Sequence, residues 1–352
     1  MTGVHHKDFN YSIAFLKAFF SFCVVCAHYW ICVNPSFYPS SMMLRMIGAA
    51  APVFFITSFF LTSASLFEKD IGKLRRRLWR LYYPQFVWAI IYFAVYMVIG
   101  MILNKIRIPN DFLIQFTKKD LLWQMITGSD RYLCPQFWYQ FDLIVFTLIF
   151  WLLFRFTGKH ASRILVITAI LCFVLQYTEW NYDLFCRFEY ELWFPLGRLA
   201  EVFPFCVSGY LLYDQKIRRI IRENKISSLV ISALLLVTAA FCPFIPKIQH
   251  GFEYGGVGLW IYSVTVFVIF DLLPFERIPE LFKRLIGFLS KYSFGVFCIH
   301  LGVGKVWECI LCPNTGLIRG TFIECIVIYL ISLILSWLIS LIPSKYAAQL
   351  VN

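Results

Sequence analysis

The chain has 352 residues, of which 60% are hydrophobic, 19% aromatic and 15% charged, and its net charge is +12. A soluble globular protein needs more polar surface than this composition supplies, so that class is excluded. The mean hydropathy of +0.71 predicts instead an all-α, polytopic integral membrane protein. Anionic lipid and membrane topology account for the positive charge, and no nucleic-acid partner is expected.

Apolar runs of about 20 residues, the length that crosses a bilayer core, recur along the chain. We expect about ten membrane-spanning helices, at 12–32, 44–66, 83–103, 136–155, 163–178, 193–213, 227–246, 256–273, 292–311 and 320–342. The first run has no small-residue cleavage site, so we expect it to be retained rather than removed as a signal peptide. Residues 1–352 are interpreted as a single membrane domain.

Charge placement predicts the orientation of these spans. Lysine and arginine cluster after the second, fourth, sixth and eighth spans, which the positive-inside bias places in the cytoplasm together with both termini. The loop 104–135 is basic although it falls on the opposite side, which its length permits. The acidic loop 179–191 fits the outer side.

The first span carries two ionisable groups, Lys17 and His28, eleven positions apart. At 100° per residue this spacing returns both side chains to nearly the same helix face, with Ser21 between them. An ionisable group inside a membrane is costly unless it faces protein or water, so both are expected to point inward. Two alternatives stay open: Lys17 reaching the membrane interface, and His28 serving as a packed structural histidine.

Polar residues in other spans fall at a similar depth to His28 when the span directions alternate. They are Asp142, Arg198, Glu201, Lys305, Glu308 and Glu324. Their convergence predicts a buried polar cavity open to the outside, although Arg198 and Glu201 are also spaced as an intrahelical ion pair. His300 is expected near mid-membrane. No HxxxH or HxxE pattern accompanies the histidines, which favours proton transfer over metal binding, and no metal site is expected.

Twelve cysteines are present, and two pairs have the C-x-x-C spacing. Small apolar packing residues are the favoured interpretation, because neither pair has a second pair of ligands. Six cysteines fall at or near the predicted outer face, where an oxidising environment would permit a disulfide: Cys32, Cys134, Cys186, Cys242, Cys309 and Cys312.

A basic segment, KLRRRLWRLYYPQF at 73–86, follows the second span. Arg77 and Arg80 share a helix face at i and i+3, and Pro84 is expected to mark the turn into the third span. Arginine forks match phosphate oxygens, so the pair suits a phosphorylated ligand. The alternative is a topological cluster that meets lipid headgroups.

The sequence resembles the acyltransferase family 3 membrane proteins at four places in the same order. These are Lys17 with His28, the segment Pro52-Val-Phe-Phe-Ile-Thr-Ser58, the segment Arg77-Leu-Trp-Arg80-Leu81 followed by Pro84, and the segment Ser293-Phe-Gly-Val-Phe-Cys-Ile-His300. Two positions depart from the family pattern, which usually has arginine at the position of Lys17 and glycine at that of Phe59. Lysine keeps the charge without the fork, and phenylalanine prevents the close approach that glycine permits.

The resemblance implies a membrane O-acyltransferase that moves an acyl group, most often acetyl, from cytoplasmic acyl-CoA. The implied acceptor is a hydroxyl of a surface polysaccharide or lipid-linked glycan, which indicates the inner membrane of a bacterium. Neither the acyl group, acetyl or succinyl, nor the oligomeric state follows from the sequence.

The resemblance also implies roles for particular residues. Acyl-CoA would bind at Arg77 and Arg80, with Ser58 and His300 also contacting it. His28 would accept the proton of the acceptor hydroxyl or become acylated itself. Lys17 would guide the thioester, and either Asp142 or Glu201 would orient the imidazole.

Two other function classes stay open. A transporter, flippase or glycan polymerase would also use buried polar groups, although no paired Gly/Pro-broken spans are present. A non-catalytic relative that serves an envelope complex would fit the departures at Lys17 and Phe59. Binding of acyl-CoA separates the enzyme from the transporter class.

Overall fold

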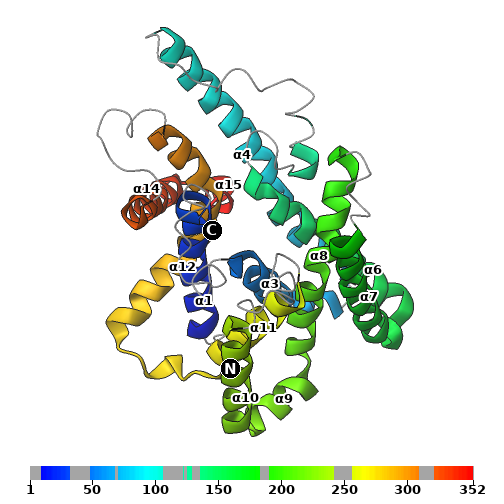
Figure 1. Ribbon diagram of the computed structural model, residues 1–352. Helices are drawn as coiled ribbons and strands as arrows, with labels where there is room; N and C mark the ends of the chain where they lie inside the picture. The colour runs from blue at the N-terminus through cyan, green and yellow to red at the C-terminus, as the bar shows by residue number, and fades with distance from the viewer. Residues whose placement is uncertain are drawn as a thin grey trace, which may run out of the picture.

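The computed structural model describes residues 9–31, 48–67, 70–105, 122, 125–128, 135–182, 190–241, 256–308 and 321–351. Within these ranges the chain is helical and contains no strand, which confirms the all-α prediction. The helices gather around α1 (Tyr11–Cys26), whose neighbours come from both ends of the sequence (Figure 1).

Each of the ten predicted spans overlaps one helix of the structure. After α1 these are α3 (Ala50–Phe67), α4 (Ile71–Lys105), α6 (Trp138–Thr157), α7 (Ala161–Tyr182), α8 (Tyr190–Tyr213), α10 (Lys225–Phe241), α11 (Val257–Leu272), α12 (Glu280–Val306) and α14 (Phe322–Ser340). Shorter helices accompany them: η1 (Ala27–Ile31), η2 (Pro135–Phe137), η3 (Gly158–His160), α9 (Gln215–Glu223), η6 (Phe275–Arg277) and α15 (Lys345–Gln349).

Among the described residues, five helical stretches are long and apolar enough to cross a membrane, and they make the chain a multi-pass membrane protein. They are Tyr11–Tyr29, Ile71–Lys105, Pro135–Tyr177, Glu280–Val306 and Phe322–Ser340. Three shorter apolar helices accompany them, at Ala50–Ala64, Lys225–Ala239 and Val257–Leu272. The exact number of crossings, the sides of the termini and the single domain stay predictions.

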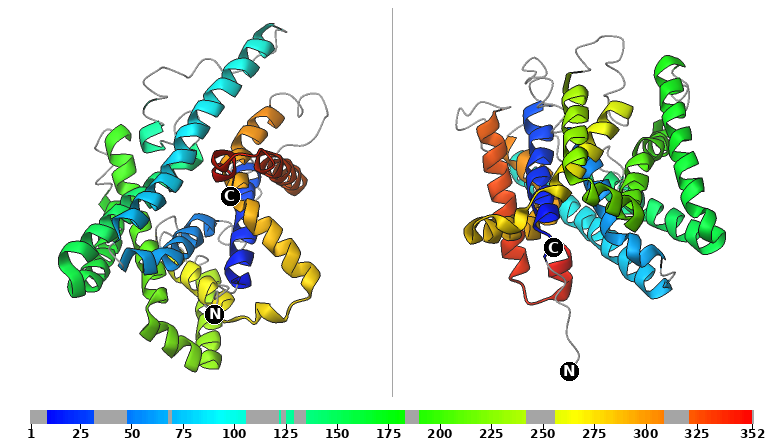
Figure 2. Two further views of the ribbon diagram at one scale, coloured as in Figure 1. Left: turned by 180° about the vertical axis from the view of Figure 1, so that it is seen from behind. Right: turned by 90° about the horizontal axis from the view of Figure 1, so that it is seen from below.

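The expected turn at Pro84 is wrong, because α4 runs through it as one helix of 35 residues. Proline removes one helical hydrogen bond, and a membrane bundle tolerates this loss when neighbouring helices surround the site. Asp70 caps the early start of the helix, since its carboxylate accepts from the backbone N–H groups of Gly72 and Lys73. At its other end α4 extends beyond the rest of the bundle (Figure 2).

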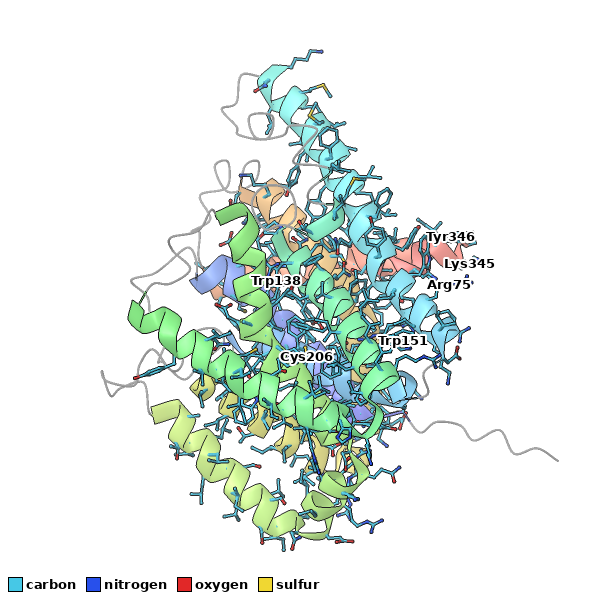
Figure 3. All side chains as sticks on the ribbon, turned by 90° about the vertical axis from the view of Figure 1, so that its right-hand side faces the viewer. Arg75, Trp138, Trp151, Cys206, Lys345 and Tyr346 are labelled. Carbon is cyan, nitrogen blue, oxygen red and sulfur yellow. The ribbon has the colours of Figure 1, made fainter. Side chains whose placement is uncertain are left out.

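The last short helix, α15, returns to the basic end of α4. The rings of Tyr83 and Tyr346 lie 5.8 Å apart between their centroids. In the view of Figure 3, Lys345 and Tyr346 lie on the same side of the molecule as Arg75, at its edge. The C-terminal part of the chain therefore packs beside the segment that carries the arginine cluster.

The α1 helix is the central contact of the bundle. It packs against α3, α11, α12 and α14. Aromatic rings fill these contacts, for example Phe15 of α1 against Phe270 of α11, with ring centroids 5.3 Å apart. Four helices therefore surround α1, and most of its side chains face protein. Lys17 can for this reason face protein although it lies in an apolar segment.

The contact between α3 and α8 is close enough to involve the backbone. Gly209 of α8 faces the carbonyl group of Ile56, and a Cβ atom at this position would collide with that oxygen. Because the obstacle is backbone, a larger residue can be accommodated only if the two helices move apart. This close approach holds α3, which carries Thr57 and Ser58, in place.

We expect Gly209→Ala to destabilise the protein by about 1–3 kcal/mol, as is usual when a packed contact is overfilled. The matched control is Gly197→Ala in the same helix, where no described atom lies within 4 Å of the added Cβ. Thermal unfolding in lipid nanodiscs measures the difference. Equal unfolding temperatures for the two variants would contradict the close α3–α8 contact.

Candidate functional site

A cavity of about 590 Å³ lies between α1, α3, α4, α6 and α12. Five of its lining side chains are cationic: Lys17, Lys73, Arg76, Arg77 and Arg80. None of the described residues that line it is acidic. A concave surface with one sign of charge concentrates ions of the opposite sign, so this cavity favours an anion.

Arg77 is the most firmly held of these cations. Its Nε donates to the hydroxyl of Thr147 in α6 at 2.9 Å, and its Nη2 donates to the hydroxyl of Ser58 in α3 at 3.2 Å. The guanidinium also lies 5.8 Å from the ring centroid of Phe59. Arg77 therefore joins α4 to α3 and α6, and its position is fixed before any ligand binds.

Phe59, one of the two departures from the family pattern, is fully buried. Its ring packs on Phe150 of α6, with 4.6 Å between the centroids, and it supports Arg77 from the side. It is not among the residues that line the cavity. The larger side chain at this position therefore fills the core and leaves the cavity open.

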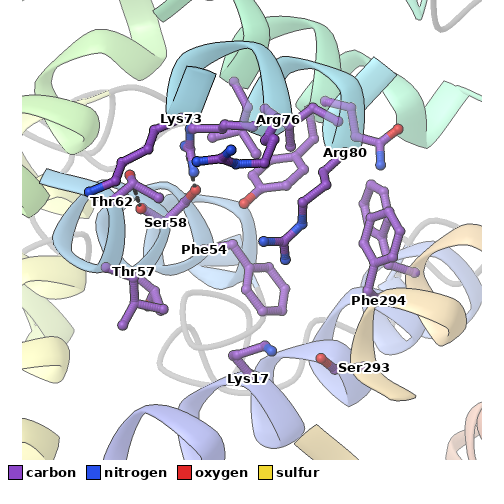
Figure 4. A pocket seen from close by; sticks show the side chains of 17 residues that line it. Lys17, Phe54, Thr57, Ser58, Thr62, Lys73, Arg76, Arg80, Ser293 and Phe294 are labelled. Carbon is purple, nitrogen blue, oxygen red and sulfur yellow. Dashed lines mark hydrogen bonds between the residues drawn. The ribbon is translucent and has the colours of Figure 1, made fainter. Parts of the chain in front are cut away.

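Lys17, the second departure, lies on the opposite wall of the cavity from the arginines. Figure 4 shows Lys17 and Ser293 facing Lys73, Arg76 and Arg80 across the open space. The structure thus places Lys17, Ser58, Arg77 and Arg80 around one cavity, although they come from three helices. Ser21 does not line it, because its hydroxyl lies 3.3 Å from that of Tyr329 in α14.

His28 lies just beyond α1, in the π-helical turn η1. The predicted span 12–32 implies a regular helix through this position, and the change of hydrogen-bond register in η1 alters the direction of the side chain. The ring centroids of His28 and His300 are 5.3 Å apart. Two histidines from distant parts of the chain therefore form a pair inside the bundle.

The tautomer of His300 follows from its backbone contacts. Its Nδ1 lies 2.9 Å from the carbonyl oxygen of Phe297 and 3.0 Å from that of Val296. Carbonyl oxygens only accept, so Nδ1 carries the proton and Nε2 has a free lone pair. This Nε2 is buried and has no hydrogen-bond partner in the described part of the chain.

Tyr29 fixes η1 against α12. Its hydroxyl contacts the carbonyl oxygens of His300 and Leu301, each at 3.2 Å. Its ring occupies the space above Gly304, where a Cβ atom would collide with it. The glycine therefore permits the approach that brings His28 beside His300.

Phe297 separates the histidine pair from the cavity. It lines the cavity, and its ring centroid is 6.4 Å from that of His300. The rings of Tyr139 and Phe137 pack against it at 5.5 and 6.2 Å. A ligand that enters beside the arginines meets this aromatic wall before it reaches a histidine.

The two predicted carboxylates lie elsewhere. Asp142 is fully buried in α6 and forms an ion pair at 3.3 Å with Arg198 of α8, whose guanidinium lies 4.8 Å from the ring centroid of Trp138. Glu201 is half-buried on the same helix as Arg198, and the two charges interact. Among the described residues, His28 has no hydrogen bond or ion pair with either carboxylate.

Several residues at the site were not singled out from the sequence. Thr147 holds Arg77, Phe297 separates the cavity from the histidines, and Gln140 and Thr57 line the cavity as buried polar side chains. Gln140 carried a signal, since an amide within an apolar span needs a partner. The others look like ordinary residues of membrane helices, and only the packing reveals their position.

The six cysteines considered for a disulfide all lie outside the described residues, so that hypothesis is not tested. The cysteines that the structure does describe are buried, and no two of them form a disulfide: Cys23, Cys26, Cys172, Cys206, Cys298 and Cys325. In the same described ranges, no three His, Cys, Asp or Glu side chains are grouped so that they could hold a metal ion.

Comparison with known proteins gives one family match. The sequence model of a family described as an acyltransferase domain matches residues 10–341. The matched region runs from α1 through α14, and it includes the cavity and both histidines. No curated protein and no solved structure matches the chain.

We expect pyrophosphate to raise the unfolding temperature of the protein, because a ligand that binds only the folded state stabilises it, by about 2.7 kcal/mol at 100 times its Kd. Arg80→Met should weaken this effect. Arg75→Met is the control, since Arg75 is also exposed on α4 but does not line the cavity. Equal shifts for both variants would show that the anion binds elsewhere.

Proposed function

The chain belongs to the acyltransferase family whose model it matches, and on this premise we propose that it transfers an acyl group, acetyl in the first place, from cytoplasmic acyl-CoA to a hydroxyl of an extracytoplasmic glycan. One observation carries the proposal: a cavity lined by five cations of the described residues ends at Phe297, whose ring lies 6.4 Å from that of the buried His300, the neighbour of His28. An acyltransferase of this kind needs both a site for an anionic donor and a base that the donor can reach.

The basic cavity suits the phosphate-rich end of coenzyme A. The forks of Arg77 and Arg80 match phosphate oxygens, and Lys73 and Arg76 add charge on the same wall. The predicted topology puts this end of α4 in the cytoplasm, where acyl-CoA is made. The thin arm of the donor would then extend between α3, α6 and α12 towards Phe297.

The reaction needs a base and a way to stabilise the developing oxyanion. In our proposal His28 takes the proton of the acceptor hydroxyl while the hydroxyl oxygen attacks the thioester carbonyl carbon. The carbon–sulfur bond then breaks, and the proton passes to the thiolate of coenzyme A. Transfer through an acylated His28 is the second route. Lys17 lines the cavity on the donor side of Phe297, where it would guide the thioester towards His28.

The contacts favour His300 over Asp142 or Glu201 as the residue that orients His28. The Nδ1 proton of His300 is held by two backbone carbonyls, so its Nε2 is available as an acceptor next to His28. Asp142 is instead engaged by Arg198. We therefore assign the two carboxylates to the packing of α6 against α8.

The acceptor is proposed to enter from the outer side. The carboxylates of Glu308 and Glu324 act electrostatically on Tyr29, next to the histidine pair. Tyr29 in η1, Glu308 just after α12 and Glu324 in α14 thus bring polar groups together, and in our proposal these groups offer hydrogen-bond partners to a sugar hydroxyl. A surface polysaccharide or a lipid-linked glycan in the inner membrane of a bacterium fits this arrangement.

The other function classes are less well supported. The family match makes the chain an acyltransferase, which argues against a transporter, flippase or polymerase. The positions of the two unusual residues argue against an inactive relative, because Lys17 lines the cavity, whereas Phe59 packs beside Arg77 and does not line the cavity.

His28→Ala should lower acyl transfer about 10²–10⁴-fold, because it removes the general base. His160→Ala is the matched control, since His160 is exposed in the short helix η3. Alkali-labile acyl esters on surface glycans are measured in cells that carry each variant, together with the amount of protein in the membrane. Wild-type ester content with His28→Ala would refute the assignment of His28.

Phe297→Ala should broaden the range of acyl groups, because it shortens the wall between the cavity and His300. We expect the ratio of kcat/KM for butyryl-CoA to that for acetyl-CoA to rise about 10-fold or more, the size of effect that extra methylenes have in a pocket. Phe294→Ala is the control, because Phe294 also lines the cavity and stacks on Phe297. An equal change in both variants would mean that Phe297 does not limit the acyl group.

A further inference from the structure

Two polar side chains line the basic cavity and have no hydrogen-bond partner for their polar atoms in the described part of the protein. Gln140 of α6 is 0% exposed, and both its Nε2 and its Oε1 lack a partner. Thr57 of α3 is 3% exposed, and its Oγ1 lacks a partner. Leaving a buried polar group unpaired costs about 1–3 kcal/mol, so such groups call for an explanation.

In three other buried glutamines of the protein, the side-chain amide nitrogen donates a hydrogen bond to a backbone carbonyl oxygen. The Nε2 of Gln176 donates to the carbonyl oxygen of Ala200 at 3.0 Å. The Nε2 of Gln136 donates to the carbonyl oxygen of Cys298 at 3.0 Å, and that of Gln85 to the carbonyl oxygen of Met125 at 3.1 Å. Gln140 differs from these three because neither end of its amide is used, and it differs also in facing a cavity.

Gln140 and Thr57 lie between the two ends of the proposed donor path. Thr57 adjoins Ser58, which accepts a hydrogen bond from Arg77, and Figure 4 shows the two residues together on α3. Gln140 adjoins Tyr139, whose ring packs on Phe297. A ligand with phosphates at the arginines and a reactive group at Phe297 would therefore pass both side chains.

We propose that Gln140 and Thr57 form a hydrogen-bonding subsite for the amide groups in the pantetheine arm of the donor. A side-chain amide is complementary to another amide: Oε1 accepts from the N–H of the arm, and Nε2 donates to its carbonyl oxygen. The Thr57 hydroxyl supplies one further donor. This inference rests on the proposed function, and it means that the enzyme recognises the carrier arm as well as the phosphates.

The test measures how much the arm and the phosphates each contribute to binding, and it uses two probes. Coenzyme A has both the phosphates and the arm, whereas adenosine 3′,5′-bisphosphate has phosphates but no arm. Binding is measured by calorimetry on the purified full-length protein in nanodiscs. Gln140→Leu should weaken coenzyme A binding about tenfold and leave the bisphosphate unchanged, and Thr57→Val should act in the same direction. Arg80→Met should weaken both probes.

Gln176→Leu is the matched control, because it replaces a buried glutamine that has a protein partner and does not line the cavity. It should leave both affinities unchanged and lower the unfolding temperature. Gln140→Leu should keep or raise the unfolding temperature of the ligand-free protein, since it removes an unpaired buried group. This readout detects misfolding of the variant, and Thr57→Val provides the second, independent substitution.

The outcomes distinguish the subsite from the proposed function. If both probes bind the wild type but Gln140→Leu and Thr57→Val leave coenzyme A affinity unchanged, or weaken both probes equally, the amide subsite is refuted and the donor assignment stands. If neither probe binds the wild type, the proposed donor is wrong and the subsite is refuted with it.

Discussion

The arrangement of α3, α4 and α6 depends on Arg77, a cation among apolar helices whose N–H groups need acceptors from the protein. Arg77 meets this requirement through the hydroxyls of Ser58 and Thr147, so that one guanidinium connects α4 with α3 and α6. The three helices are thereby held around a space that none of them could enclose alone. Because Arg77 is already held in place, an anion that enters the cavity meets a positioned fork and does not have to order a flexible side chain.

The site has two chemically different parts, the cavity and the histidine pair, and the aromatic side chains around Phe297 separate them. On one side the cavity offers cations, hydroxyls and an amide, which suit a long, charged donor. On the other side the rings of His28 and His300 lie 5.3 Å apart, where our proposal places the transfer of the acceptor's proton. Phe297 contacts both the cavity and His300. The size of a group that can pass from the cavity to the histidines therefore depends on Phe297 and the rings packed against it.

Local signals in the sequence were enough for the helices, because the length and hydropathy of an apolar run do not depend on tertiary structure. They were also enough to single out Lys17, His28, Arg77 and Arg80, since a charge inside an apolar run is visible in one segment. The partners could not be predicted: Asp142 pairs with Arg198, and His28 lies beside His300, only because of how the helices pack. The π-helical turn at His28 depends in the same way on the fit between Tyr29 and Gly304. The predicted turn at Pro84 is wrong because proline interrupts helices in water more strongly than helices that are packed in a membrane bundle.

The contact between Tyr29 and α12 has a consequence for biosynthesis. Tyr29 and Leu301, which it joins, are 272 residues apart in the sequence. A ribosome therefore delivers the first helix to the membrane long before its partner exists, and α1 must wait there with Lys17 and His28 still lacking their final surroundings. The histidine pair is completed only when α12 arrives. A nascent chain that stops earlier therefore carries the arginines of α4 without a finished histidine pair, and polar groups of α1 still lack their protein partners in the membrane.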